Sequence, residues 1–359
     1  MRRRLWSSAA FCVVCSVLAL PAAAAAQTKV VFAGGPGGFA NSLQKKYGGG
    51  VNDFLIRRVT IHTGDSVLWD GKSLAGGFHT VDIPAAGGSD VPLIIPTGTT
   101  VSGVNDAAGN PFWFNGLVPN LTFNPPLFAA SGGHKYTGAA RVESGLPLGP
   151  PKSFKVKFTK PGVYHYFCDV HYGMKGTVVV LAKQKHIPSV KQDGKTLKAE
   201  ENAYVASAKQ VDQTTVAADT VSVGASGPHG LEVFAMFPAT LHVQPQTTVT
   251  FLMSSQTRET HTATFGDTAP GGYVYQLGQT AFNSPTGAID PRGAYPSDVP
   301  MPISLSPSSH GNGFANTGAL DRDAATPNLA SAQIKFTHPG TYHYICLIHA
   351  FMHGTVIVP

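Results

Sequence analysis

The chain has 359 residues, of which 43% are apolar and 13% charged, with 40 glycines and 27 prolines. This composition is too apolar for a disordered protein and too poor in charge for a coiled coil or a long helical bundle. Abundant turn residues with few charges indicate short strands joined by turns, and the length allows about two domains. The formal net charge of +6 includes three arginines of an N-terminal leader, and it gives no reason to expect a nucleic-acid partner.

The N-terminal segment has the layout of a secretory leader. Three arginines at positions 2–4 precede an apolar run over 11–20, and an alanine tract ends at residue 26. A membrane anchor is the alternative, but the run is shorter than the roughly 20 residues that a spanning helix needs. We therefore predict a signal peptide over 1–26 and an exported protein, periplasmic or secreted, with no membrane span in the mature chain.

Removal of the leader leaves two cysteines, Cys168 and Cys346. In an oxidising compartment the simplest interpretation pairs them in a disulfide. Each cysteine, however, lies in a short run of metal-binding residue types, and the two runs are copies of each other. We therefore predict one metal site per copy and no disulfide.

An internal repeat is the strongest organisational signal in the chain. Residues 156–180 (VKFTKPGVYHYFCDVHYGMKGTVVV) and 334–358 (IKFTHPGTYHYICLIHAFMHGTVIV) are identical at 15 of 25 positions, at a constant offset of 178. Upstream of each copy, the segments RVTIHTGDSVLW from Arg58 and TLHVQPQTTVTFL from Thr240 alternate apolar and polar residues about a turn, which predicts strands.

These patterns predict an all-β chain made of two similar halves. Each half also carries a long insertion rich in glycine, proline and asparagine, of the kind that is usually functional cover or a disordered loop. The connection between the halves is rich in lysine and glutamine, and we expect a solvated linker with a short helix. The predicted divisions are a signal peptide over 1–26, domain 1 over 28–181, a linker over 182–219 with its helix near 199–210, and domain 2 over 220–359.

Each repeat contains a loop with cysteine, histidine and methionine at three-residue spacing: Cys168, His171 and Met174, then Cys346, His349 and Met352. Thiolate and thioether are soft ligands that favour copper, and two histidines with one cysteine and a weak axial methionine are typical of an electron-transfer copper site. The second imidazole has to come from another segment. His79 and His261 follow equivalent strands in the two halves and are the candidates.

The G-D-S-V-L-W turn, the following H-T-V and the P-G-x-Y-H-Y-x-C-x-x-H-x-x-M-x-G-T-V run resemble the cupredoxins, the blue copper proteins of the plastocyanin, pseudoazurin and amicyanin group. The short interval from cysteine to methionine is most similar to amicyanin. The resemblance implies two Greek-key β-sandwich domains in tandem with long loop insertions, and two type 1 copper ions, one per domain. It implies His79, Cys168, His171 and Met174 as ligands of one ion, and His261, Cys346, His349 and Met352 as ligands of the other.

By this resemblance the chain is a copper-binding electron-transfer protein that serves redox partner proteins. The resemblance also places the loop histidines near the surface, with Tyr172 and Phe351 as candidates for a docking patch. A copper storage or delivery protein is the alternative, but the chain lacks Met-rich or His-rich tracts. A two-domain copper oxidoreductase is less favoured, because neither an H-x-H pair nor a histidine beside either cysteine occurs. We therefore expect no enzyme.

Several neighbouring residues have simpler interpretations. Strand alternation puts His165 and His343 on the face opposite the cysteines, which predicts surface residues. Asp82 follows His79 at the spacing seen in copper nitrite reductases, but Pro84 replaces the histidine expected there, so Asp82 is interpreted as an ordinary loop acid.

The two cysteines also differ in their neighbours. Asp169 follows Cys168, whereas Leu347 follows Cys346. A negative charge favours the oxidised ion and an apolar shell the reduced one, so we expect the second site to have the higher reduction potential.

Overall fold

The computed structural model describes residues 25–71, 77–146 and 153–359. The predicted signal peptide over 1–26 therefore lies almost wholly outside the described residues. The described chain is mostly β-strand with few helices, in agreement with the all-β prediction. Across these three ranges no helix combines the length and the apolarity needed to cross a membrane.

Two five-stranded sheets and a core of buried side chains make the first half of the structure. The first sheet has the order β3 (Phe54–Leu55), β1 (Thr28–Ala33), β5 (Ser66–Asp70), β11 (Phe154–Phe158), β9 (Lys135–Tyr136). The second has the order β10 (Val142–Glu143), β6 (Asp82–Ile83), β12 (Gly162–Phe167), β13 (Lys175–Leu181), β4 (Arg58–His62). In β11 each apolar residue is buried and each lysine exposed, as strict alternation requires.

A six-stranded and a five-stranded sheet make the second half, around a core of their own. The larger has the order β2 (Gly49–Val51), β15 (Leu231–Phe237), β14 (Thr220–Gly227), β17 (Thr248–Leu252), β22 (Ser331–Phe336), β20 (Ile303–Leu305). The smaller has the order β16 (Thr240–His242), β24 (His353–Val358), β23 (Gly340–Ile345), β18 (Thr264–Phe265), β21 (Ala315–Asn316). The Greek-key connectivity expected from the resemblance stays a prediction.

The repeated sequence forms the same hairpin in both halves. Strands β12 and β13 pair so that Tyr164 faces Val178, and β23 and β24 pair so that Tyr342 faces Val356. All six pairs of the two hairpins are related by the offset of 178. Each cysteine therefore directly follows the first strand of its hairpin, at the same end of the sheet.

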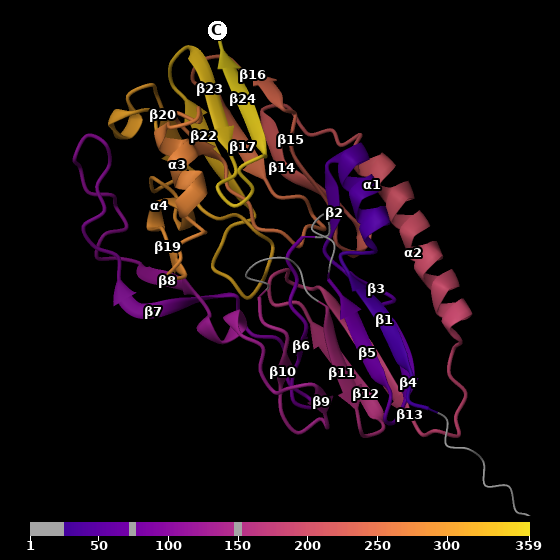
Figure 1. The fold of residues 1–359 in the computed structure, drawn as a ribbon. Helices are drawn as coiled ribbons and strands as arrows, with labels where there is room; N and C mark the ends of the chain where they lie inside the picture. Colours follow the sequence, from indigo (N-terminus) through magenta and orange to yellow (C-terminus); the bar gives the residue numbers. More distant parts are fainter. Residues whose placement is uncertain (1–24, 72–76, 147–152) are drawn as a thin grey trace, which may run out of the picture.

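The two halves exchange strands. Strand β2 lies before most of the first sandwich in sequence, yet it pairs with β15 of the second. The insertion of the first half forms β7 (Ile94–Thr100) and β8 (Pro119–Phe123), and β8 pairs with β19 (Ala288–Ile289) from the second half. In Figure 1 the purple β7 and β8 lie beneath β19 and the orange α4 (Pro291–Ala294). Segments from both sides of residues 181 and 220 thus contribute to shared sheets. The domain limits at these residues stay a prediction.

Two helices are longer, α1 (Gly37–Tyr47) and α2 (Val190–Val211). The other helical segments are short: α3 (Tyr273–Thr280), α4 (Pro291–Ala294), and single turns over Pro125–Phe128, Pro228–Gly230 and Ser309–Gly311. Helices α1 and α2 lie side by side along one edge of the molecule (Figure 1). The linker helix α2 is longer than predicted; most of its residues are exposed, and one face near its C-terminal end is packed. Its side chains at 204, 208 and 211 recur at helical spacing and are buried.

Ser189 begins α2 with a capping box, in which its hydroxyl accepts the Gln192 N–H and the Gln192 side chain accepts the Ser189 N–H. Near the other end, the Tyr204 hydroxyl shares its one proton between two acceptors, Asp53 at 3.0 Å and the His229 carbonyl at 2.9 Å. Asp53 belongs to the first half and His229 to the second. The linker helix therefore binds both halves to each other.

Replacing Tyr204 by alanine is expected to lower the free energy of unfolding by about 3–5 kcal/mol, because a buried aromatic ring and two hydrogen bonds are lost. Chemical denaturation followed by circular dichroism measures this change. Val205→Ala, one residue along on the exposed side of the helix, is the control and should change the free energy by about 0.5 kcal/mol or less. Equal effects of the two variants would contradict the packed role of the helix.

Candidate metal centres

The first predicted ligand set is brought together at the end of the first sandwich. The Cys168 sulfur lies 3.8 Å from Nδ1 of His79 and 3.6 Å from Nδ1 of His171, and the two Nδ1 atoms are 3.1 Å apart. Cys168 and Met174 are each 1% exposed and belong to one core cluster. The donor atoms of His79, Cys168 and His171 therefore meet in one small volume, and Met174 is buried in the same core cluster as the cysteine.

The second set repeats this geometry. The Cys346 sulfur lies 3.7 Å from Nδ1 of His261 and 3.8 Å from Nδ1 of His349, with 3.1 Å between the two nitrogens. Cys346 and Met352 are buried in one core cluster of the second sandwich. His79 and His261, predicted from their position alone, thus reach the cysteine in the same way as the loop histidines.

Each ligand loop is closed by the hairpin that carries it. In the first loop the Cys168 N–H donates to the Met174 carbonyl at 3.0 Å, and the Met174 N–H donates to the His171 carbonyl at 3.1 Å. The second loop has the same two bonds, at 3.0 and 2.7 Å, between the equivalent residues. Rigid strand ends and short closed loops hold the donor atoms before any ion arrives.

The sulfur–nitrogen separations fit a single ion. Atoms about 2.0–2.3 Å from a common ion in a trigonal array are about 3.5–4.0 Å apart, and the sulfur–nitrogen separations of both centres fall in that range. The two nitrogens of each centre are closer together, at 3.1 Å. In all four histidines Nδ1 faces the sulfur. A trigonal pair of imidazoles and a thiolate, with a methionine buried in the same cluster, suits copper.

The cysteines are prepared to bind as thiolates. Burial opposes the negative charge of Cys168, but hydrogen bonds and charges from His171 and His79 outweigh it and lower the pKa of Cys168 well below its usual range. The same balance lowers the pKa of Cys346. Because the thiolate is the metal ligand, both centres are electrostatically set for a cation. Both cysteines are free of disulfides, as predicted.

A carboxylate that the sequence analysis did not single out connects the two centres. Glu259 is 7% exposed, and its side chain lies 3.3 Å from Nε2 of His171 and 3.7 Å from Nε2 of His349. Burial works against the charge of His171, but Glu259 outweighs it and raises the pKa of His171 to about 10. In turn the histidines overcome the effect of burial and lower the pKa of Glu259 below its usual range. One carboxylate thus pairs with a loop histidine of each centre, more closely with His171 than with His349.

Glu259 is held by the segment that crosses between the halves. The side-chain amide of Asn52, directly after β2, donates to Glu259 at 2.6 Å. Arg258 donates to the Asn52 carbonyl at 2.8 Å and lies 3.4 Å from Asp53. Only a weak signal in the sequence could have pointed to Glu259. It stands two residues before His261, at the position that Gly77 occupies before His79 in the first half.

The first loop histidine is an interior group, contrary to the expectation of a surface exit. His171 is 6% exposed. Tyr172, expected on a docking patch, donates its hydroxyl to the Thr257 carbonyl at 2.6 Å and accepts the Arg322 N–H at 3.2 Å, both in the second half. The expectation failed because it treated each half as an isolated domain, whereas the second half covers this face.

Two exposed aromatic side chains remain beside the centres. Phe351 is 64% exposed and contacts His349, in agreement with its expected surface position. Phe78, directly before His79, is 57% exposed. Each centre therefore has a solvent-exposed phenylalanine beside it.

The insertion of the first half covers the flank of the second ligand loop. Val101, Phe112 and Phe114 of that insertion form one buried cluster with Ile345 and Leu347, the two residues that flank Cys346. The second cysteine also accepts backbone N–H donors from Thr262 and His349, each at 3.4 Å. Its surroundings are thus apolar and rich in N–H donors.

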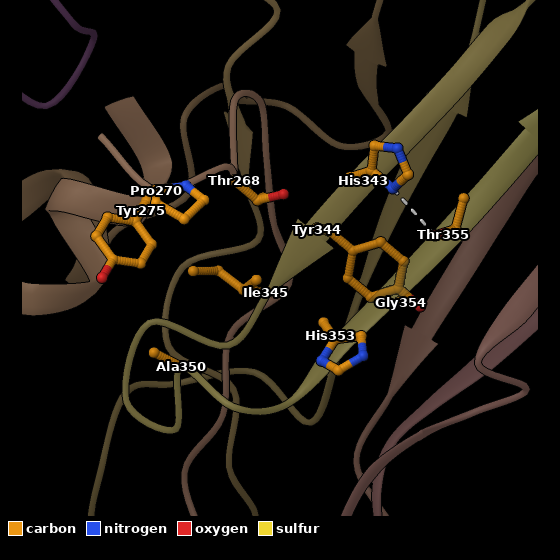
Figure 2. A pocket seen from close by; sticks show the side chains of 10 residues that line it. All are labelled: Thr268, Pro270, Tyr275, His343, Tyr344, Ile345, Ala350, His353, Gly354 and Thr355. Atoms are coloured by element: carbon orange, nitrogen blue, oxygen red, sulfur yellow. Dashed lines mark hydrogen bonds between the residues drawn. The ribbon is translucent and has the colours of Figure 1, made fainter. Parts of the chain in front are cut away.

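Figure 2 shows the outer face of the hairpin that carries the second loop. A shallow groove of about 340 Å³ lies there between β23, β24 and the start of α3. His343 and His353 both line it, and His343 contacts the Thr355 hydroxyl at 3.1 Å. His343 and its counterpart His165 are exposed, as strand alternation predicted.

Asp82 is not the loop acid that the sequence suggested. It lies on β6 and is fully buried, with Glu143 and Asp169 beside it. The error has a local cause, because the two-residue strand β6 is too short to show alternation in the sequence.

Comparison with known proteins supports the copper assignment for part of the chain. Residues 95–181 match the family model of copper binding proteins, plastocyanin/azurin family. This range includes Cys168, His171 and Met174 and leaves His79 outside. Amicyanin-alpha from Methylorubrum extorquens is 42% identical over 52 residues, which are 14% of this chain and 44% of that protein. The match thus spans less than half the length of this relative.

Similar solved structures include the oxidised plastocyanin of Dryopteris crassirhizoma, with 20% identity and a TM-score of 0.21 over 39% of this chain and 99% of that one. They also include a Cu(I) form of an amicyanin variant, with 15% identity and a TM-score of 0.21 over 43% and 82% of the two chains. The family match and the curated relative support the presence of a cupredoxin domain of the plastocyanin and amicyanin family within this chain.

Proposed function

We propose that this chain is an exported electron-transfer protein with two type 1 copper centres, one in each half. The observation that carries the proposal is the duplicated donor set, with sulfur–nitrogen separations of 3.6–3.8 Å in both copies. Bound copper would supply one-electron oxidation and reduction. The protein's part is to hold the donors nearly fixed, so that little rearrangement opposes the transfer.

The role of each ligand follows from its chemistry. Cys168 and Cys346 provide thiolates, and the four histidines provide Nδ1. Met174 and Met352, buried in the same clusters as the cysteines, would provide a weak thioether ligand. Glu259 lies close to Nε2 of His171, where it would orient the ring and strengthen the imidazole as a ligand, and its charge also acts on His349 from 3.7 Å.

Glu259 further suggests that the two centres exchange electrons within the chain. Each loop histidine would be a ligand of its copper ion, and both histidines approach one carboxylate. The route between the centres is therefore short, buried and made of fixed groups. Redox partner proteins would reach the pair from outside at Phe351 or Phe78, where aromatic side chains are exposed.

Copper storage or delivery is the alternative function. The burial of Cys168 and Cys346, which are 1% and 0% exposed, supports retention of the ion rather than its release. A copper oxidoreductase is less favoured. Among the residues that the structure describes, the histidine-containing metal groups are the two His–Cys–His sets, and both include the cysteine typical of electron transfer.

Adding two equivalents of Cu(II) to the full chain is expected to produce intense blue or green absorption from thiolate-to-copper charge transfer. Cys168→Ser or Cys346→Ser should each remove one copper and its share of the absorption, and the double variant should remove all of it. Visible spectroscopy and metal analysis measure both. A colourless complex of the parent chain would favour storage or delivery instead.

The second centre is expected to have the higher reduction potential. Cys346 accepts two N–H donors and lies beside buried Leu347, which stabilises the reduced ion, whereas Asp169 lies beside Cys168. Redox titration of Cys346→Ser and Cys168→Ser, each with one centre left, measures the two potentials separately. Equal or reversed potentials would show that these neighbours do not set the order.

Glu259→Gln is expected to raise both potentials, because the buried negative charge that favours the oxidised ions is lost. A change on the order of 1–2 kcal/mol at each centre corresponds to about 40–90 mV for one electron. Redox titration measures it, and pulse radiolysis should show slower exchange between the centres.

Glu232→Gln is the matched control for this variant. Glu232 is also buried, but its carboxyl accepts the Thr257 hydroxyl and the Arg258 N–H instead of contacting a loop histidine. Burial, followed by the charge of Glu259, raises the pKa of Glu232 well above its usual range, so glutamine is the less disruptive replacement there. Equal shifts in the two variants would exclude a specific role for Glu259.

A further inference from the structure

Three carboxylates meet beside the first centre, on the sheet face opposite the core, because their chain neighbours Ile83, Val142 and Cys168 point into the core cluster. Asp82, Glu143 and Asp169 are 0%, 2% and 7% exposed, and one oxygen from each lies within 4.8 Å of the other two. The topology explains the meeting. Glu143 on β10 pairs directly with Asp82 on β6, and β12, which pairs with β6 on its other side, ends two residues before Asp169.

Each carboxylate is held from outside by a donor. Arg141 pairs with Oδ2 of Asp82, and the Gly145 N–H donates to Oε1 of Glu143 at 3.1 Å. Asp169 accepts the Thr80 hydroxyl at 2.9 Å and the Val91 N–H at 3.2 Å. These bonds fix the three groups in place without neutralising them, since Arg141 supplies one positive charge for three acids.

Two oxygens of the cluster have no donor. Within the described part of the chain, Asp82 Oδ1 and Glu143 Oε2 are fully buried and have no hydrogen-bond partner. A buried carboxylate oxygen without a donor or counter-ion costs free energy. The pKa values reflect the same penalty on negative charge: burial, followed by the charge of Asp169, raises the pKa of Asp82 to about 7 and that of Glu143 to about 9.

The second half provides an internal comparison at the same place. Thr264 and Asn316 form the equivalent strand pair, and Leu347 takes the position of Asp169. The Thr264 hydroxyl donates to the Asn316 side chain at 2.7 Å, and the Asn316 amide donates to carbonyls at 2.8 and 3.0 Å. The duplicated fold is therefore satisfied by neutral residues here, and the sandwich itself does not require three acids.

We propose that Asp82, Glu143 and Asp169 form a binding site for one hard divalent cation of the Ca²⁺ type. Carboxylate oxygens select hard cations over copper. Two ligands of one Ca²⁺ can be up to about 4.6–5.2 Å apart, which accommodates the observed separations. Mg²⁺ is less suited, because it usually keeps several waters and this cluster is buried. The site does not depend on copper and lies beyond the proposed electron-transfer function.

Calorimetric titration of the chelator-treated full chain with CaCl₂ tests this site. One equivalent of Ca²⁺ is expected to bind, and Ca²⁺ should raise the melting temperature of the parent chain. Glu143→Gln should weaken binding at least about tenfold and abolish the thermal response, since a ligand oxygen and its charge are lost. Asp90→Asn, which removes an exposed acid near the cluster, is the control and should bind Ca²⁺ like the parent.

Folding of the variant is checked in the same experiment. In chelator, Glu143→Gln should melt at or above the temperature of the parent, because an amide is tolerated at the equivalent Asn316 and charge repulsion is reduced. If Glu143→Gln does not fold, Asp82→Asn is used in its place. No binding at 1 mM Ca²⁺, or equal affinity in the parent and Glu143→Gln, would overturn the proposal and show that protons alone neutralise the cluster.

Discussion

The buried charge of Glu259 is the constraint on which the arrangement of the two halves depends. A carboxylate that is 7% exposed must be compensated inside the protein. Its partners come from three separate segments: the first ligand loop, the second ligand loop and the connection after β2. Displacing one half relative to the other would separate Glu259 from its partners on the opposite side of the junction. The two centres are therefore positioned relative to each other as strictly as the ligands are within each centre.

Other contacts at the junction reinforce this position. Asp53, next to the Asn52 that holds Glu259, is 1% exposed and accepts from Arg57 and from Tyr204 of the linker helix. Arg258, next to Glu259 itself, contacts the same aspartate. The charges of the junction thus form one network, in which each buried acid has a basic or hydroxyl partner. Such networks favour one relative orientation over many similar ones.

The parts of the molecule that could be predicted from sequence are those with local patterns. The hairpins follow from alternation in VYHYF and TYHYI, and the dense Cys-x-x-His-x-x-Met spacing identifies three donors per centre without any knowledge of the fold. His79 and His261 could be placed because they follow equivalent strands. The remaining features depend on contacts between distant segments. Glu259 acquires its role only when the halves meet, and Asp82 joins its acidic neighbours only through the pairing of β6 with β10 and β12.

The exchange of strands between the halves has a consequence for how the chain can be made. Residues 49–51 complete a sheet whose neighbouring strand spans 231–237, so their backbone groups have no partner until most of the chain has been synthesised. The outer edge of β8, in the purple ribbon of Figure 1, likewise gains its partner only when residues 288–289 have been synthesised. Unpaired strand edges of this kind invite pairing with other chains. A copy of either half excised at the linker would lose edge strands or their cover, so the duplicated halves are no longer interchangeable modules and must mature as one unit.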